Sequence, residues 1–276
     1  MNKTIRLAII YDFDGTLAPG NMQERDFIPA IGMKTKEFWN EVSILAKQHQ
    51  ADNILSYMKL MLDKAQQAHV PVRKNDFHEY GKNLCFFKGI LSETKSDDKG
   101  WFAKINDYGK QRNTIVEHYI VSSGIREMIE GSQLANEFKT IYASSFIYDH
   151  NGIAVWPALA INYTTKTQYL FRINKGCLDV SDNLSINKNI PEKERDIPFA
   201  HMIYIGDGET DIPCFRLVKD KGGCAIAVYK PNTKGARKKT NNLILEGRVN
   251  HIAPADYRNN SDIDRFVKER INTILQ

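Results

Sequence analysis

The chain has 276 residues, of which 42% are hydrophobic and 26% charged, as is usual for a folded globular protein. A net charge of +5 is too small for a nucleic-acid-binding surface, so we expect no nucleic-acid partner. No apolar run is long enough to cross a membrane or to serve as a secretory signal. The four cysteines form no Cys-x-x-Cys pair, which excludes the common zinc and redox motifs and predicts free thiols in a cytoplasmic protein.

The first predicted strand covers residues 7–11 and is followed directly by Asp12-Phe13-Asp14-Gly15-Thr16. A short apolar run that ends in turn residues is typical of a buried strand in a parallel sheet. Two carboxylates therefore lie at the carboxyl end of that strand, which is the edge where open α/β sheets bind ligands. An ordinary acidic turn is the alternative interpretation of this stretch alone.

Residues 20–88 contain no convincing strand and show helical spacing instead. We predict helices over residues 35–48, from Asp52 onward, and over residues 74–84. Their apolar stripes, which include Trp39, are interpreted as the core of a helical bundle. We therefore expect residues 20–88 to form a small helical domain inserted after the first strand, while residues 1–19 and 89–276 form the α/β core.

The rest of the chain alternates strands and helices, which indicates a doubly wound, mostly parallel sheet with a Rossmann-like core. A polar run at 179–198 is expected to be a surface excursion, and the basic run at 234–239 a solvated face. The remaining elements are a polar loop at 92–99, helices at 101–111, 125–135, 164–173, 212–218 and 261–275, and strands at 118–121, 140–148, 153–163, 201–205, 223–229 and 249–253.

Polar residues follow several of these strands and would meet at one edge of the sheet. Ser122 comes after the strand at 118–121, Asp207 and Asp211 come after the strand at 201–205, and Lys166 stands at a helix start. With Asp12 and Asp14 they form a strongly acidic set of oxygen ligands, which suits Mg²⁺.

These residues resemble the four motifs of the haloacid dehalogenase-like hydrolase superfamily. Asp12-Phe13-Asp14-Gly15-Thr16 is similar to its first motif, and Gly206-Asp207-Gly208-Glu209-Thr210-Asp211 is similar to its fourth. Ser122 and Lys166 stand where the second and third motifs belong, with Lys175 as an alternative to Lys166. The helical insertion resembles the cap domain of the phosphoserine phosphatase-like branch.

The resemblance implies a phosphatase that works through an aspartyl-phosphate. Asp12 would be the nucleophile and Asp14 the general acid and base. Asp12, Asp207 and the backbone carbonyl of Asp14 would hold Mg²⁺, with Asp211 supporting them from behind. Ser122, Lys166 and Thr16 would bind the phosphoryl oxygens, although Thr16 is also interpreted as a brace for its own turn, and Ser122 is a plausible helix cap.

The substrate is expected to be a small phosphorylated metabolite, chosen by the cap near Asn21, Glu24 and Arg25. Asn21 stands where phosphoserine phosphatases of this superfamily carry a glutamate that reads the substrate amine, a departure that argues against serine phosphate. A phosphotransferase or mutase is the alternative enzyme, and a non-catalytic binding module the alternative outside enzymes. The sequence does not indicate an oligomeric state.

Overall fold

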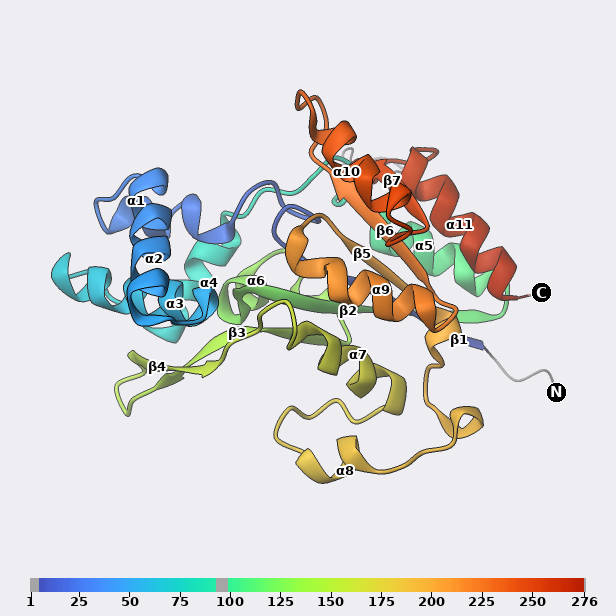
Figure 1. Cartoon of the computed structure of the whole chain (residues 1–276), viewed down its shortest axis with the longest axis horizontal. Helices are drawn as coiled ribbons and strands as arrows, with labels where there is room; N and C mark the ends of the chain where they lie inside the picture. Colours follow the sequence, from blue (N-terminus) through green and yellow to red (C-terminus); the bar gives the residue numbers. More distant parts are fainter. Residues whose placement is uncertain (1–4, 93–98, 276) are drawn as a thin grey trace.

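The computed structural model describes residues 5–92 and 99–275 and has a central seven-stranded sheet of order β4-β3-β2-β1-β5-β6-β7 (Figure 1). Neighbouring strands are parallel except β3 and β4, which are antiparallel. This confirms the predicted doubly wound, mostly parallel sheet. The strands are β1 (Ile5–Tyr11), β2 (Thr114–Ile125), β3 (Thr140–Tyr148), β4 (Ala154–Leu159), β5 (Met202–Gly206), β6 (Cys224–Tyr229) and β7 (His251–Pro254).

Alternate residues of β1 point to opposite faces of the sheet, and each face has its own apolar core. Leu7, Ile9 and Tyr11 join the core beneath α5 (Trp101–Lys110) and α11 (Asp262–Ile274). Ala8 and Ile10 join the core beneath α7 (Lys166–Lys175) and α9 (Ile212–Asp220). Because both faces are covered, this strand is apolar without interruption. Two further helices that cover the sheet are α6 (Arg126–Gly131) and α10 (Ala236–Leu245).

A helical insertion follows β1 and lies at one end of the sheet (Figure 1). Its last helix, α4, lies directly against α6 of the core, where a side chain on Gly81 would collide with the Met128 carbonyl. The Phe77 ring of α4 also stacks on the Phe146 ring of β3, with centroids 5.5 Å apart. The insertion is therefore anchored to the core through α4. Its helices are α1 (Phe27–Ala30), α2 (Thr35–His49), α3 (Asn53–Gln67) and α4 (Lys74–Lys82).

The predicted strand at 140–148 is confirmed with the same bounds, whereas the strand at 118–121 extends over residues 114–125 as β2. The register of β2 against β3 shifts between Val121 and Ile125, so the polar Ser122-Ser123-Gly124 run bulges within the strand. The helix predicted at 125–135 ends earlier, at Gly131. The loop predicted at 92–99 lies mostly outside the described residues.

The basic run at 234–239 overlaps the start of α10, a helix that the sequence did not predict. Four cationic side chains in this run obscured the helical spacing, although Leu243 and Ile244 of the same helix pack on the sheet.

The excursion at 179–198 contains the short helix α8 (Asn183–Asn187) and is tied to the core by two cations of α7. The buried Arg172 guanidinium donates to the carbonyls of Asp179 and Val180, at 2.6 and 3.1 Å, and Lys175 donates to the carbonyl of Ile186. Within the described ranges, no helix is both long and apolar enough to span a membrane.

Candidate active site

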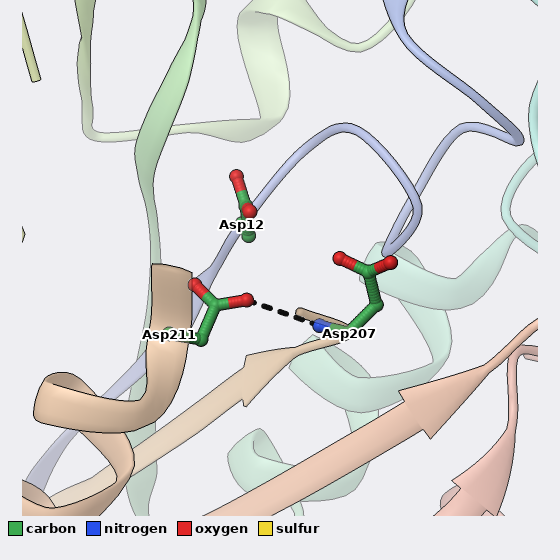
Figure 2. Close-up of side chains that lie close together, drawn as sticks. All are labelled: Asp12, Asp207 and Asp211. Carbon is green, nitrogen blue, oxygen red and sulfur yellow. Dashed lines mark hydrogen bonds between the residues drawn. The ribbon is translucent and has the colours of Figure 1, made fainter. Parts of the chain in front are cut away.

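Asp12 and Asp207 are neighbours because the strands before them are neighbours. Tyr11 of β1 pairs with Ile205 of β5, and the Asp12 N–H donates to the Ile205 carbonyl at 2.9 Å. One carboxylate oxygen from each of Asp12, Asp207 and Asp211 lies within 4.8 Å of the others (Figure 2). The three carboxylates therefore meet at the carboxyl edge of the sheet, as the sequence predicts.

Gly15 allows Asp207 to approach the turn after β1. Its φ is +74°, in the left-handed region, and a Cβ at this position would collide with the Asp207 carboxylate. A side chain on Gly15 is therefore incompatible with the observed position of Asp207.

Both Asp211 oxygens are fully occupied by donors from the protein. The Lys166 ammonium and the Tyr204 hydroxyl each donate to Oδ1 at 2.7 Å. The Asp207 N–H donates to Oδ2 at 3.1 Å (Figure 2). The Gly208 N–H donates to the same oxygen at 3.1 Å. Although Asp211 lies in the acidic cluster, these four bonds leave Asp12 and Asp207 better placed to hold a cation.

Lys166 is fully buried in the first turn of α7, 2.8 Å from Asp12 Oδ2. Burial alone would lower its pKa, but Asp12 and Asp211 outweigh that effect and raise the pKa, so the ammonium stays charged. The alternative, Lys175, lies at the other end of α7 and holds the 179–198 excursion instead.

Asp12 and Asp14 face different surroundings. Burial raises the pKa of Asp12, and the Lys166 ammonium opposes that shift. Asp14 has no such cation; burial and the nearby Asp12 carboxylate hold its pKa well above the ordinary value, although the Met22 N–H donates to it at 3.0 Å. The Lys166 ammonium thus favours the ionised form of Asp12, whereas the surroundings of Asp14 favour its protonated form.

Asp207 opens into a cavity, yet the protein around it removes enough water to raise its pKa to about 8, helped by the charges of Asp211 and Asp12. A carboxylate in this position is stabilised by a bound cation. Together, Asp12 and Asp207 supply the oxygen ligands that Mg²⁺ prefers.

A family model for haloacid dehalogenase-like hydrolases matches residues 9–216, which include every predicted motif residue. The chain belongs to this hydrolase family. An uncharacterized protein from Borreliella burgdorferi is 30% identical over 292 residues, and the match covers 96% of each chain.

Solved structures share the fold of this hydrolase. A HAD family hydrolase from Salmonella enterica serovar Typhi has a TM-score of 0.59 and 15% identity, over 95% of this chain and 69% of that one. A substrate-bound phosphoserine phosphatase has a TM-score of 0.56 and 16% identity, over 97% of this chain and 99% of that one. At these identities the similarity shows the fold alone.

The hydrolase has a cavity of about 520 Å³ between the sheet edge and the insertion. Asp12, Asp14, Asp207 and Ser122 line it, and Ser122 Oγ accepts the Gly124 N–H at 3.1 Å. Thr16 is buried behind this lining, and no described residue bonds its hydroxyl. The backbone of Thr16, not its hydroxyl, holds the turn: its N–H donates to the Phe13 carbonyl at 3.3 Å, and its carbonyl accepts from the Tyr257 hydroxyl at 2.8 Å.

Of the predicted specificity residues, only Asn21 lines the cavity. Its amide donates to Glu24 Oε1 at 2.8 Å, so Glu24 contacts a lining residue but does not line the cavity itself. Arg25 points into a separate hollow, where its guanidinium donates to Cys85 Sγ at 2.6 Å. The structure does not bring Arg25 to the cavity of this hydrolase.

The sequence did not indicate most of the residues with which the helical insertion lines the cavity. Trp39 belongs to an apolar helical stripe that the sequence predicts to be core. The structure packs Trp39 against that core and also places it on the cavity. Gln23, Asn53 and Tyr57 line the same wall. No local motif marks these side chains, because the folding of α2 and α3 against the core is what brings them together.

Proposed function

We propose that this protein is a Mg²⁺-dependent phosphomonoester hydrolase that acts on a small phosphorylated metabolite through an aspartyl-phosphate on Asp12. The observation that carries the proposal is the contrast between two carboxyls in one cavity. Asp12 is paired with the buried Lys166 ammonium at 2.8 Å, while burial and Asp12 raise the pKa of Asp14. One group is suited to attack and the other to transfer a proton.

In the first step, an Asp12 carboxylate oxygen attacks phosphorus and forms a new P–O bond. The ester P–O bond breaks, its electron pair leaves on the ester oxygen, and Asp14 protonates that oxygen. In the second step, water attacks the phosphorus of phospho-Asp12 and gives its proton to Asp14. The P–O bond to Asp12 then breaks, so that inorganic phosphate leaves and both aspartates return to their starting states.

The residues present fit a divalent cation, because Asp12 and Asp207 lie in one cluster in which loss of water and neighbouring carboxylates raise the pKa of both. Asp12, Asp207 and the Asp14 carbonyl would hold Mg²⁺. When bound, Mg²⁺ reduces repulsion between Asp12 and the anionic phosphate. Asp211, whose oxygens accept four protein donors, orients Lys166 and the Asp207–Gly208 backbone.

Ser122 and the third N–H of Lys166 are proposed to bind the phosphoryl oxygens. We also propose residues 20–88 as the cap and residues 1–19 and 89–276 as the catalytic core. A cytoplasmic location belongs to the same proposal and is supported by the free thiols of Cys85, Cys177, Cys214 and Cys224.

The test is a panel of phosphorylated metabolites assayed with Mg²⁺ and with a chelator. We expect turnover with Mg²⁺, a strong loss with chelator, and loss of about 1000-fold or more in Asp12→Asn. Circular dichroism would establish that the variant is folded. Substantial turnover by folded Asp12→Asn would contradict the proposal.

A further inference from the structure

The cavity has one charged wall and one uncharged wall. Its charged lining residues, Asp12, Asp14, Asp207 and Lys230, all belong to the α/β core. Among the described residues, those that line it from the insertion carry no charge. Lys230 is exposed and follows β6, the strand beside β5, so it lies on the Asp207 side.

Gln23 gives the uncharged wall a hydrogen-bond acceptor that has no donor from the described protein. Its side chain is 2% exposed and lines the cavity, and no described residue donates to its Oε1. A buried amide oxygen without a partner is costly, so a ligand donor at this position would be bound favourably. The preceding N–H, of Met22, donates to Asp14. Gln23 therefore follows directly on the residue that holds the proposed proton donor, and both Gln23 and Asp14 line the cavity.

Trp39 gives the same wall a fixed flat surface. Its indole N–H donates to Glu24 Oε1 at 2.8 Å, and its ring meets Tyr57 edge to face with centroids 5.9 Å apart. Asn21 donates to the same Glu24 oxygen at 2.8 Å. Glu24 does not itself line the cavity, and two neutral donors from this wall already occupy its Oε1.

We propose that the leaving group of the substrate is an uncharged, hydroxylated alcohol, such as a sugar or a nucleoside. One of its hydroxyls donates to Gln23 Oε1, and a flat face packs on Trp39. A phosphorylated amino acid is disfavoured, because its ammonium and carboxylate would lose water against a wall without charge. This inference rests on the proposed phosphatase function.

The first experiment compares kcat/KM of the wild-type enzyme with Mg²⁺ for four compounds. They are a hexose phosphate, a nucleoside monophosphate, phosphoserine and acetyl phosphate, whose small leaving group makes little contact with the wall. We expect kcat/KM for the hexose or the nucleoside ester to exceed that for phosphoserine by about 100-fold. The ammonium and the carboxylate of phosphoserine would each remain unpaired, and each is expected to lower kcat/KM about tenfold. The better of the two esters distinguishes a sugar site from a nucleoside site.

The second experiment replaces Gln23. Gln23→Leu removes the acceptor and is expected to raise KM for the preferred ester about tenfold more than for acetyl phosphate. Gln23→Glu keeps the shape and the acceptor, and is expected to raise kcat/KM for phosphoethanolamine about tenfold by adding a charge that pairs with an amine. Gln67→Leu is the matched control, because Gln67 is an exposed amide at the end of α3.

The outcomes separate the two proposals. Absence of Asp12-dependent turnover for every compound, acetyl phosphate included, contradicts the phosphatase function and this inference with it. Asp12-dependent turnover that is fastest with phosphoserine contradicts this inference alone. Equal effects of Gln23→Leu and Gln67→Leu would also overturn it, and the Gln23→Glu result keeps the test decisive if Gln23→Leu fails to fold.

Discussion

The Lys166 ammonium lies 2.8 Å from Asp12 Oδ2, although Asp12 follows the first strand and Lys166 begins α7, far along the sequence. Neither the amine nor the nearby Asp211 carboxylate is exposed. The charge of Asp12 therefore depends on one buried cation rather than on water. The ion pair between Lys166 and Asp12 is therefore expected to contribute both to the folding stability of this sheet edge and to the proposed reaction of Asp12.

Replacement of Lys166 by methionine should damage both properties. Removing one partner of a buried ion pair costs about 3–5 kcal/mol, and losing one donor to a phosphoryl transition state costs about 100-fold or more in kcat. Urea unfolding and steady-state kinetics measure the two effects. Lys175→Met is the matched control, because Lys175 holds the Ile186 and Lys188 carbonyls at 2.5 and 2.8 Å, away from Asp12. Equal turnover of the two variants would refute the assignment of Lys166.

Replacement of Gly15 by alanine should displace Asp207 as well as strain the backbone. The left-handed φ of +74° costs a non-glycine residue about 1 kcal/mol, and the new methyl would collide with the Asp207 carboxylate. Gly32→Ala is the control, since Gly32 has a φ of +73° and nothing within 4 Å of the added Cβ. We expect both variants to lose stability, but only Gly15→Ala to lose apparent Mg²⁺ affinity, measured by metal titration of activity. Similar metal affinities would show that the collision is relieved elsewhere.

His118 should make the protein less stable in acid. Burial lowers its pKa from 6.5 to about 3, while its Nδ1 and Nε2 are hydrogen-bonded at 3.0 Å to Tyr11 and Asn106. Between these pKa values the unfolded chain binds a proton that the folded chain does not, so stability falls as the pH is lowered from 6.5 toward 3. The contribution is about 1.4 kcal/mol per pH unit.

Urea unfolding at several pH values measures this slope. His118→Gln should flatten it between about pH 6 and 4 by that amount. His150→Gln, which changes an exposed histidine, should leave it unchanged. An unaltered slope in His118→Gln would mean that His118 is protonated in the folded protein.

The sequence predicted the meeting of Asp12 and Asp207 at the sheet edge much better than the cavity wall opposite them. Asp12 and Asp207 each follow an apolar strand, and parallel strands place such positions together whatever their separation in sequence. Trp39 and Gln23 obey no comparable rule. Trp39 fits a buried helical stripe, and its exposure to the cavity depends on how α2 packs against the core.

The predicted ends of one strand and one helix were wrong, because contacts with other parts of the fold determine where these elements stop. Ser122 was expected to follow its strand, but β2 continues through a bulge to Ile125. The helix after it ends at Gly131, whose missing side chain admits the His78 backbone of α4. Neither the bulge nor the contact with His78 can be predicted from the residues next to them in the sequence.

Replacement of Asp14 by asparagine should separate the two chemical steps. The variant cannot protonate a leaving group or accept a proton from water, but p-nitrophenol leaves without acid assistance. With p-nitrophenyl phosphate we expect a rapid burst near one product per enzyme, followed by turnover slowed about 100-fold or more. Stopped-flow absorbance measures both phases. Linear release of p-nitrophenol without a burst would argue against rate-limiting hydrolysis of a covalent intermediate.

The most direct test of the account is to find the phosphoryl group on Asp12. Asp14→Asn is mixed with Mg²⁺ and p-nitrophenyl phosphate, quenched in acid during the slow phase, digested and analysed by mass spectrometry. The account predicts one phosphoryl group on the peptide that contains Asp12, labile to hydroxylamine and absent when Asp12 is also replaced by asparagine. Turnover with no phosphorylated peptide, or with the phosphoryl group on Ser122 instead, would contradict it.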